Sequence, residues 1–204
     1  MVFIFQSKHF MYDFYFNVLL KRCGRENIEL LFSDTDSFCF YTKDNKKFEN
    51  EMMDFMDYSN YPENHRLHDK SRNSKLGFFK DEIDANSQCK EYVGLRSKCY
   101  ALNIVNRKTN EISHKKVCKG LGRISIKNRL KFSEYKRCLF KKEDIRHYYT
   151  GIVSQKHNLF TVVRNKRALS CFDSKRFIFN CGVHSTAFGS CLIKKYGNKC
   201  YKCK

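Results

Sequence analysis

The sequence predicts an α+β fold in which an antiparallel sheet packs against helices. Apolar residues recur at intervals of three and four over residues 4–23, which is typical of a helix, and Gly24 is expected to end it. Two apolar runs, Ile28–Phe32 and Phe38–Tyr41, flank a short polar turn. The few residues between these runs leave no room for a crossover, so we expect an antiparallel hairpin.

The remaining elements are predicted in chain order from the same periodicities. The apolar face of the first helix is expected to consist of Phe5, His9, Tyr12, Phe16, Leu19 and Leu20. A second helix is predicted at Glu49–Met56, and a third over Ser133–Tyr149 with Ser133 as its N-cap. No regular structure is expected from Ser190 onward. Strands are predicted at Phe78–Ile83, Glu91–Gly94, Cys99–Val105, Ile112–Cys118, Leu159–Val163 and Arg176–Phe179.

Charge divides the 204-residue chain into two different halves. Residues 1–103 carry 15 Lys/Arg and 16 Asp/Glu, whereas residues 104–204 carry 25 and 5, so the net formal charges are −1 and +20. A field this positive attracts polyanions, and nucleic acid is the commonest such partner. The alternative is a solvated basic surface that has no partner.

Composition also limits the compartment in which the protein is expected. No apolar run approaches the roughly 20 residues that a membrane-spanning helix needs, and no export signal is visible. The 11 cysteines are odd in number, which is typical of a reduced protein with free thiols. We therefore expect an intracellular protein, nuclear or cytoplasmic, that is neither secreted nor bound to a membrane.

Two carboxylates lie in the predicted hairpin turn. Asp34 and Asp36 are two residues apart, so both can point toward one side. Two like charges this close are costly unless they are neutralised, and Mg²⁺ is a hard cation that binds carboxylate oxygens together with substrate phosphates. Such a pair is typical of two-metal phosphoryl or nucleotidyl transfer. The alternative is an ordinary polar turn, in which Asp and Ser are frequent.

The residues around this turn resemble a known family. The segment Leu30–Phe38 resembles the motif C hairpin of family B DNA polymerases. The order and spacing of further segments are similar to the protein-primed, organellar and viral branch, and closest to the polymerases of Polinton/Maverick transposons, over roughly residues 7–189. These segments are Met11–Phe14, Gly77–Glu82, Glu91–Tyr100, Lys115–Gly120, Tyr135–Phe140 and Asp173–Phe177.

The resemblance implies a polymerase palm and thumb. The palm would be an antiparallel sheet with the acidic hairpin and flanking helices, and it would occupy residues 1–120. A small, mixed, basic thumb would occupy residues 121–189, and a basic, cysteine-containing tail residues 190–204. The fold would be incomplete.

The resemblance also implies roles for individual residues. Asp36 would ligate a catalytic Mg²⁺ directly, with Asp34 as its supporting ligand. Lys98 and Tyr100 match the Lys-x-Tyr motif that contacts the primer strand, and Arg96 would contact the DNA backbone. The alternatives are a surface lysine and a strand aromatic. A basic turn with glycines can approach phosphates closely, which favours DNA contacts by Lys119 and Arg123.

The implied function is template-directed nucleotidyl transfer during replication of a mobile or viral element. The partners would be primer–template DNA, deoxynucleoside triphosphates and a terminal protein. However, the sequence contains neither the motif A Asp-x-x-Ser-Leu-Tyr-Pro run nor the motif B Lys-x-x-x-Asn-Ser-x-Tyr-Gly run. We therefore expect a C-terminal polymerase piece that is inactive alone, or that acts with an upstream polymerase fragment. The alternative is a non-catalytic, basic nucleic-acid-binding remnant.

Cysteines are concentrated near the C-terminus. Cys200 and Cys203 form a Cys-x-x-Cys pair, and with Cys181 and Cys191 they offer four thiolates for Zn²⁺. Cys181 and Cys191 are ten residues apart, which is wider than the usual spacing of paired zinc ligands. The alternatives are therefore a zinc-dependent binding module and a disordered basic tail, and His184 is expected to be structural or exposed.

Overall fold

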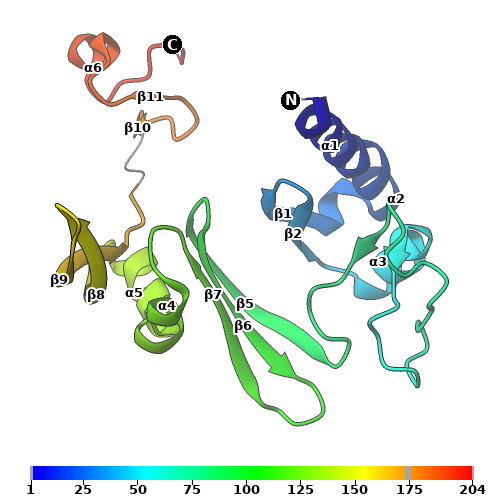
Figure 1. Ribbon diagram of the computed structural model, residues 1–204. Helices are drawn as coiled ribbons and strands as arrows, with labels where there is room; N and C mark the ends of the chain where they lie inside the picture. The colour runs from blue at the N-terminus through cyan, green and yellow to red at the C-terminus, as the bar shows by residue number, and fades with distance from the viewer. Residues whose placement is uncertain (1, 173–175, 204) are drawn as a thin grey trace. The chain divides into compact units, whose positions relative to one another are not determined.

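The computed structural model describes residues 2–172 and 176–203 and has an α+β fold (Figure 1). The chain divides into two compact units, the first formed by Met1–Cys89 and Ile104–Ile112 and the second by Lys90–Asn103 and Ser113–Lys204. The Phe5 side chain and residues 173–175, which belong to two sequence predictions, lie outside what the structure describes. Among the described residues, no helix is both long and apolar enough to cross a membrane.

The first unit begins with the predicted helix, which changes its pitch midway. The α-helix α1 (Val2–Asp13) continues as the π-helix η1 (Phe14–Leu19) and ends as α2 (Leu20–Cys23). The N–H of Gly24, at φ 89°, donates to the Leu20 carbonyl, so Gly24 ends the helix as predicted.

The predicted apolar face of this helix is wrong at three of its residues. Tyr12 is 62% and Phe16 50% exposed, and His9 is also exposed. The apolar side chains of α1 are not confined to one side, so spacings of three and four residues do not single out one buried face before Phe14. From Phe14 onward, the π turn holds more residues than an α turn and shifts the side chains away from the positions that a 3.6-residue period predicts. The helix buries Leu19 as predicted, together with Met11, Phe14 and Cys23, which lie outside the predicted face.

The core of the first unit joins this helix to the acidic hairpin. The 3₁₀ turn η2 (Arg25–Asn27) leads into β1 (Ile28–Asp34), which pairs antiparallel with β2 (Ser37–Thr42), as predicted. The helix α3 (Asn45–Met52) follows, with Asp44 as its N-cap, and ends in the 3₁₀ turn η3 (Met53–Phe55). Buried side chains from these elements pack together: Phe14, Leu19, Cys23, Ile28 and Met52.

Two short strands complete the first unit. β3 (Met56–Asp57) pairs in parallel with β4 (Phe79–Lys80), which is shorter than the predicted strand Phe78–Ile83. The Phe79 ring lies 4.3 Å from that of Phe14, measured between centroids. This contact fixes the Gly77–Glu82 segment against the N-terminal helix.

A three-stranded sheet follows, with β5 (Ser87–Arg96), β6 (Cys99–Asn106) and β7 (Ile112–Cys118) in sequence order. Short turns join neighbouring strands, which requires antiparallel pairing. The β7 bounds agree with the prediction, β6 extends one residue beyond the predicted Cys99–Val105, and β5 is longer than Glu91–Gly94. The division between the two units falls within these strands.

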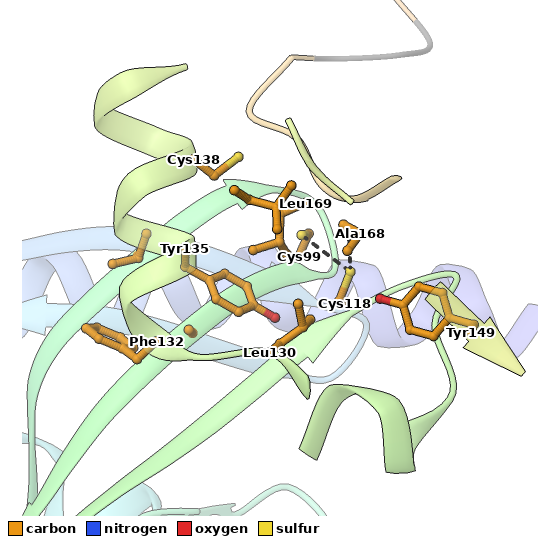
Figure 2. Packing of buried hydrophobic residues seen from close by; sticks show 12 residues of the cluster. Cys99, Cys118, Leu130, Phe132, Tyr135, Cys138, Tyr149, Ala168 and Leu169 are labelled. Carbon is orange, nitrogen blue, oxygen red and sulfur yellow. Dashed lines mark hydrogen bonds between the residues drawn. The ribbon is translucent and has the colours of Figure 1, made fainter. Parts of the chain in front are cut away.

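The core of the second unit packs β6 and β7 against a helix and a hairpin (Figure 2). After α4 (Arg123–Arg129), the helix α5 (Phe132–Lys141) directs Tyr135 and Cys138 into this core, where both are fully buried. The Tyr135 hydroxyl donates to the Val117 carbonyl at 3.1 Å, and the Cys118 thiol donates to the Ala168 carbonyl at 3.0 Å.

The predicted helix Ser133–Tyr149 is therefore too long. Its N-cap is Lys131, two residues before the predicted Ser133, and Lys142, at φ 55°, ends it. The chain then forms β8 (Ile145–Gln155), which pairs antiparallel with β9 (Asn158–Leu169). Ile145 and Tyr149 are both buried and four residues apart, a spacing that fits one face of a helix and one face of a strand equally well.

The C-terminal segment contains more regular structure than the sequence predicts. β10 (Arg176–Ile178) pairs antiparallel with β11 (Ser185–Ala187). The helix α6 (Cys191–Tyr196) follows, and the Ser190 hydroxyl caps it by accepting from the Leu192 N–H. The expectation of an irregular chain after Ser190 is therefore wrong at α6.

Candidate functional sites

The acidic hairpin presents both carboxylates at its tip. Asp34 ends β1, and Thr35 and Asp36 form a two-residue turn in which Thr35 has φ 58°. The N–H of Asp36 and the hydroxyl of Ser37 donate to the Asp34 carbonyl at 2.7 and 3.1 Å. The Thr35 hydroxyl donates to Asp34 Oδ1 at 3.3 Å. The turn backbone is thus fixed by local hydrogen bonds, with Asp34 half-buried and Asp36 exposed.

Two carboxylates alone are a partial ligand set. Within the described part of the chain, no third Asp, Glu, His or Cys side chain gathers with Asp34 and Asp36. Mg²⁺ is commonly held by one or two carboxylates together with substrate phosphates and water. The hairpin can therefore contribute to a magnesium site, for which the described residues gather two ligands.

The predicted primer-binding residues belong to the second unit. Arg96 ends β5, Tyr100 lies in β6, and Lys98 lies in the two-residue turn between these strands, at φ 56°. Residues two apart on one strand share a face, but Lys98 adopts a left-handed turn conformation outside β6, so it does not share a strand face with Tyr100. The hairpin carboxylates Asp34 and Asp36 belong to the first unit.

The backbone brings two of the predicted DNA-binding lysines together. The N–H of Lys119, directly after β7, donates to the carbonyl of Lys98 at 2.9 Å. Beyond Lys119, the turn through Gly120 (φ 102°) and Gly122 leads to Arg123 at the start of α4. The side chains of Lys98, Lys119 and Arg123 are exposed.

A pocket lies between this glycine turn and the β8–β9 hairpin. Gly120, Leu121 and Gly122 line it on the turn side, and the hairpin contributes Arg164 and Lys166, both exposed. Exposed backbone beside several cations is a suitable surface for phosphate groups. This basic pocket is an addition to the predicted site, because sequence spacing gave no reason to bring Arg164 and Lys166 to the glycine turn.

Other segments of the family resemblance have structural contacts. Lys80 Nζ lies 3.0 Å from Oδ2 of buried Asp57, which also accepts the Ser59 N–H at 2.9 Å. Burial opposes ionisation of this carboxyl, but hydrogen bonds from Ser59 and Lys80 outweigh burial and lower its pKa to about 2. In the second unit, Lys136 Nζ lies 2.6 Å from Glu91 Oε1, which joins two of the resembling segments.

Four side chains near the C-terminus form a compact cluster: Cys181, His184, Cys200 and Cys203. Their ligand atoms all lie within 4.8 Å of one another. His184 Nδ1 is 3.5 Å from Cys181 Sγ, 3.3 Å from Cys200 Sγ and 3.4 Å from Cys203 Sγ. The backbone N–H groups of His184 and Val183 lower the pKa of the Cys181 thiol to about 6.

This cluster corrects the predicted cysteine set. Cys191 is exposed in α6 and lies outside the cluster, whereas His184, expected to have only a structural or exposed role, is its fourth member. The signal that sequence reasoning missed is the spacing Cys181-x-x-His184, which is the same as that of Cys200-x-x-Cys203. Counting His with Cys would have given two pairs of metal-ligating spacing.

Comparison with known proteins gives no neighbour for this chain: no family model, no curated protein and no solved structure matches it.

Proposed function

We propose that this chain is the palm and thumb part of a family B DNA polymerase of the protein-primed type. The observation that carries the proposal is the acidic hairpin, in which Asp34 and Asp36 lie at the tip of two antiparallel strands. The same chain contains the other polymerase-like segments in family order. The reaction would be attack of a primer 3′-hydroxyl on the α-phosphate of a deoxynucleotide, during replication of a mobile or viral element.

The two aspartates would hold Mg²⁺ in that reaction. Bound Mg²⁺ would neutralise phosphate charge and orient the reacting groups. Asp36, the more exposed of the two, would bind the metal directly, and Asp34 would support it from the end of β1. The remaining carboxylate ligand would come from a motif A, which this sequence does not contain. We therefore expect no primer extension by this chain alone.

The basic second unit would bind the primer–template duplex. Lys98 and Lys119 are joined through their backbones, and Arg123 follows on the same glycine turn. Lys98 and Tyr100 would contact the primer strand, and Arg96 would contact the DNA backbone. Lys119 and Arg123, with the basic pocket beside them, would contact phosphates of the duplex.

A second candidate function is nucleic-acid binding without catalysis. The net charge of +20 over residues 104–204 favours it, and so does the absence, among the residues that the structure describes, of a third ligand gathered with Asp34 and Asp36. Both candidates predict DNA binding, and they differ in whether the acidic hairpin contributes to catalysis once motifs A and B are supplied.

Binding of a fluorescent primer–template by the full chain tests the shared prediction. Affinity should fall steeply with salt, because each phosphate contact releases counterions. A Lys119→Ala/Arg123→Ala variant should bind more weakly and lower the slope of log K against log salt by about 1 for each lost contact. The control is Lys46→Ala/Lys47→Ala, which removes the same charge from α3 of the first unit. Equal losses in both variants, or a flat salt response, would contradict a specific role for the glycine turn.

Primer extension separates the two candidates. The chain is mixed with a polypeptide that carries family B motifs A and B, with primer–template, deoxynucleotides and Mg²⁺. The polymerase proposal predicts incorporation that Asp36→Asn abolishes while DNA binding is retained. Incorporation that is absent, or that is insensitive to Asp36→Asn, would favour the non-catalytic candidate.

A further inference from the structure

We propose that Cys181, His184, Cys200 and Cys203 bind one Zn²⁺ in a structural site that stabilises residues 176–203. The distances suit this metal. Tetrahedral zinc, with Zn–S of about 2.3 Å and Zn–N of about 2.0–2.1 Å, separates its ligand atoms by roughly 3.5–3.8 Å. His184 Nδ1 lies 3.3–3.5 Å from the three sulfur atoms, so a small contraction or expansion of the cluster brings all four ligands to a common centre.

The donor set selects the metal and its role. Three thiolates and one imidazole are soft or borderline ligands, which favour Zn²⁺ over the Mg²⁺ expected at carboxylates. Four protein ligands fill a tetrahedron and leave no open position for water or substrate. The site is therefore structural, not catalytic, and it is separate from the chemistry proposed for the acidic hairpin.

The backbone orients the ligands in two similar turns. The N–H of His184 donates to Cys181 Sγ at 3.3 Å, and the N–H of Cys203 donates to Cys200 Sγ at 3.4 Å. Gly182, at φ 72°, permits the sharp turn between the first two ligands. Each turn thus directs two ligand atoms to one side, which is the geometry that metal binding through x₂ spacing requires.

Additional hydrogen bonds join the two turns. The Asn180 N–H donates to the Asn198 carbonyl at 2.9 Å, and Asn180 Oδ1 accepts from the Cys200 N–H at 3.2 Å. The Phe179 N–H donates to the His184 carbonyl at 3.0 Å, which closes the β10–β11 turn. The two halves of the ligand set therefore belong to one connected structure.

The apolar core of this segment is too small to explain its order. Among the described residues of the segment, Phe179, which is 2% exposed, is the one large side chain that is fully buried. Its ring lies 5.4 Å from those of both Phe177 and Tyr201. Segments below about 40 residues usually need a metal or disulfides to fold, and the cysteines here are free. Zinc supplies the missing stabilisation.

Metal analysis of the full chain, purified with Zn²⁺ and under reducing conditions, tests the proposal. We expect about one zinc per chain in the wild type and in Cys191→Ser, the matched control from the same segment. Cys181→Ser and Cys203→Ser should each retain less than about a tenth of an equivalent, because three ligands hold zinc far more weakly than four. Zinc-free wild-type protein, or equal zinc in Cys203→Ser and the wild type, would overturn the proposal.

Cobalt substitution separates loss of a ligand from general misfolding. Co²⁺ bound in place of Zn²⁺ should give the thiolate charge-transfer band and the strong visible bands of a tetrahedral site. His184→Cys keeps four ligands, so it should still bind one Co²⁺, with these bands shifted. His184→Ala has three ligands, so it should not bind a full equivalent of Co²⁺. A six-coordinate spectrum, or an unchanged spectrum in His184→Cys, would contradict the ligand assignment. DNA binding and primer extension do not enter these measurements, so they stand or fall separately from the proposed polymerase function.

Discussion

The acidic hairpin and the Cys/His cluster are both candidate metal sites, but they differ in completeness. The hairpin supplies Asp34 and Asp36 and no third ligand among the described residues. The cluster supplies four ligand atoms within 4.8 Å, all from residues 181–203. A magnesium site can accept ligands from phosphates and other segments, whereas a structural zinc site must be closed by the protein itself.

The acidic hairpin and the segment around the Cys/His cluster also differ in how much apolar packing stabilises them. The hairpin is packed into an apolar core with Phe14, Leu19 and Met52, so it is ordered without a metal. The C-terminal segment has Phe179 as its principal buried side chain and needs the ligand cluster to hold its turns. Metal binding is thus expected to control folding of the C-terminal segment and to leave folding of the acidic hairpin unchanged.

The largest expected effect is that of zinc removal on residues 176–203. Structural zinc contributes about 10–16 kcal/mol of apparent binding free energy, which is also folding free energy. A strong chelator should therefore speed tryptic cleavage after Lys194, Lys195 and Lys199, because the backbone around them unfolds. The helix α1–α2 should keep its protection from trypsin. Mass spectrometry of timed digests measures both. Equal loss of protection in the two regions would break the comparison.

Loss of the Asp57 carboxylate should have the next largest effect, in the first unit. Asp57→Asn removes the ion pair with Lys80 and weakens the hydrogen bond from Ser59, at a cost of about 1–3 kcal/mol in the free energy of unfolding. Asp54→Asn, an exposed neighbour, is the control and should change it by less than about 0.5 kcal/mol. Zinc content should be unaffected in both variants.

The same carboxyl gives the first unit a pH dependence of its own. The Asp57 pKa is about 2 in the folded chain and about 3.9 in the unfolded chain. Because the folded value is lower, the stabilisation is complete above about pH 4 and is lost as the pH falls toward 2. Denaturation curves of wild type and Asp57→Asn should therefore converge across this window, and a constant difference between them would contradict this account.

The smallest effect is expected at the hairpin tip. Asp36 is exposed, and its side chain is not part of the apolar core, so Asp36→Asn should change the free energy of unfolding by less than about 0.5 kcal/mol. Thermal denaturation with and without Mg²⁺ measures this change. A large stabilisation by millimolar Mg²⁺ that Asp36→Asn removes would mean that the hairpin already has a complete site.

The fold was predictable from sequence where a pattern had one interpretation. The antiparallel hairpin around Asp34 and Asp36, the bounds of β7 and, to within one residue, those of β6 followed from apolar runs and short turns. The spacing of Ile145 and Tyr149 fitted two structures, and only packing against Leu169 and the rest of the second core selected a strand. The π-helix at Phe14–Leu19 could not be predicted, because no pattern of apolar residues in the sequence distinguishes it from an α-helix.

The candidate sites show the same limit. Cys200-x-x-Cys203 was visible as a ligand pair, but its partners depended on a turn at Gly182 and on hydrogen bonds of Asn180, which no spacing rule includes. Likewise, the basic pocket depends on the position of β9 beside the glycine turn. Local pairs can be read from a sequence, whereas the completeness of a ligand set is a property of the folded chain.

X-ray absorption at the zinc edge tests the central contrast between the two regions most directly. The full chain is equilibrated with Zn²⁺ and excess Mg²⁺, and the ligand shell of the bound zinc is measured. We predict about three sulfur ligands near 2.3 Å and one nitrogen near 2.0–2.1 Å, as Cys181, His184, Cys200 and Cys203 require. A shell of oxygen and nitrogen without sulfur would place the bound metal elsewhere, including at the carboxylates, and would contradict the account.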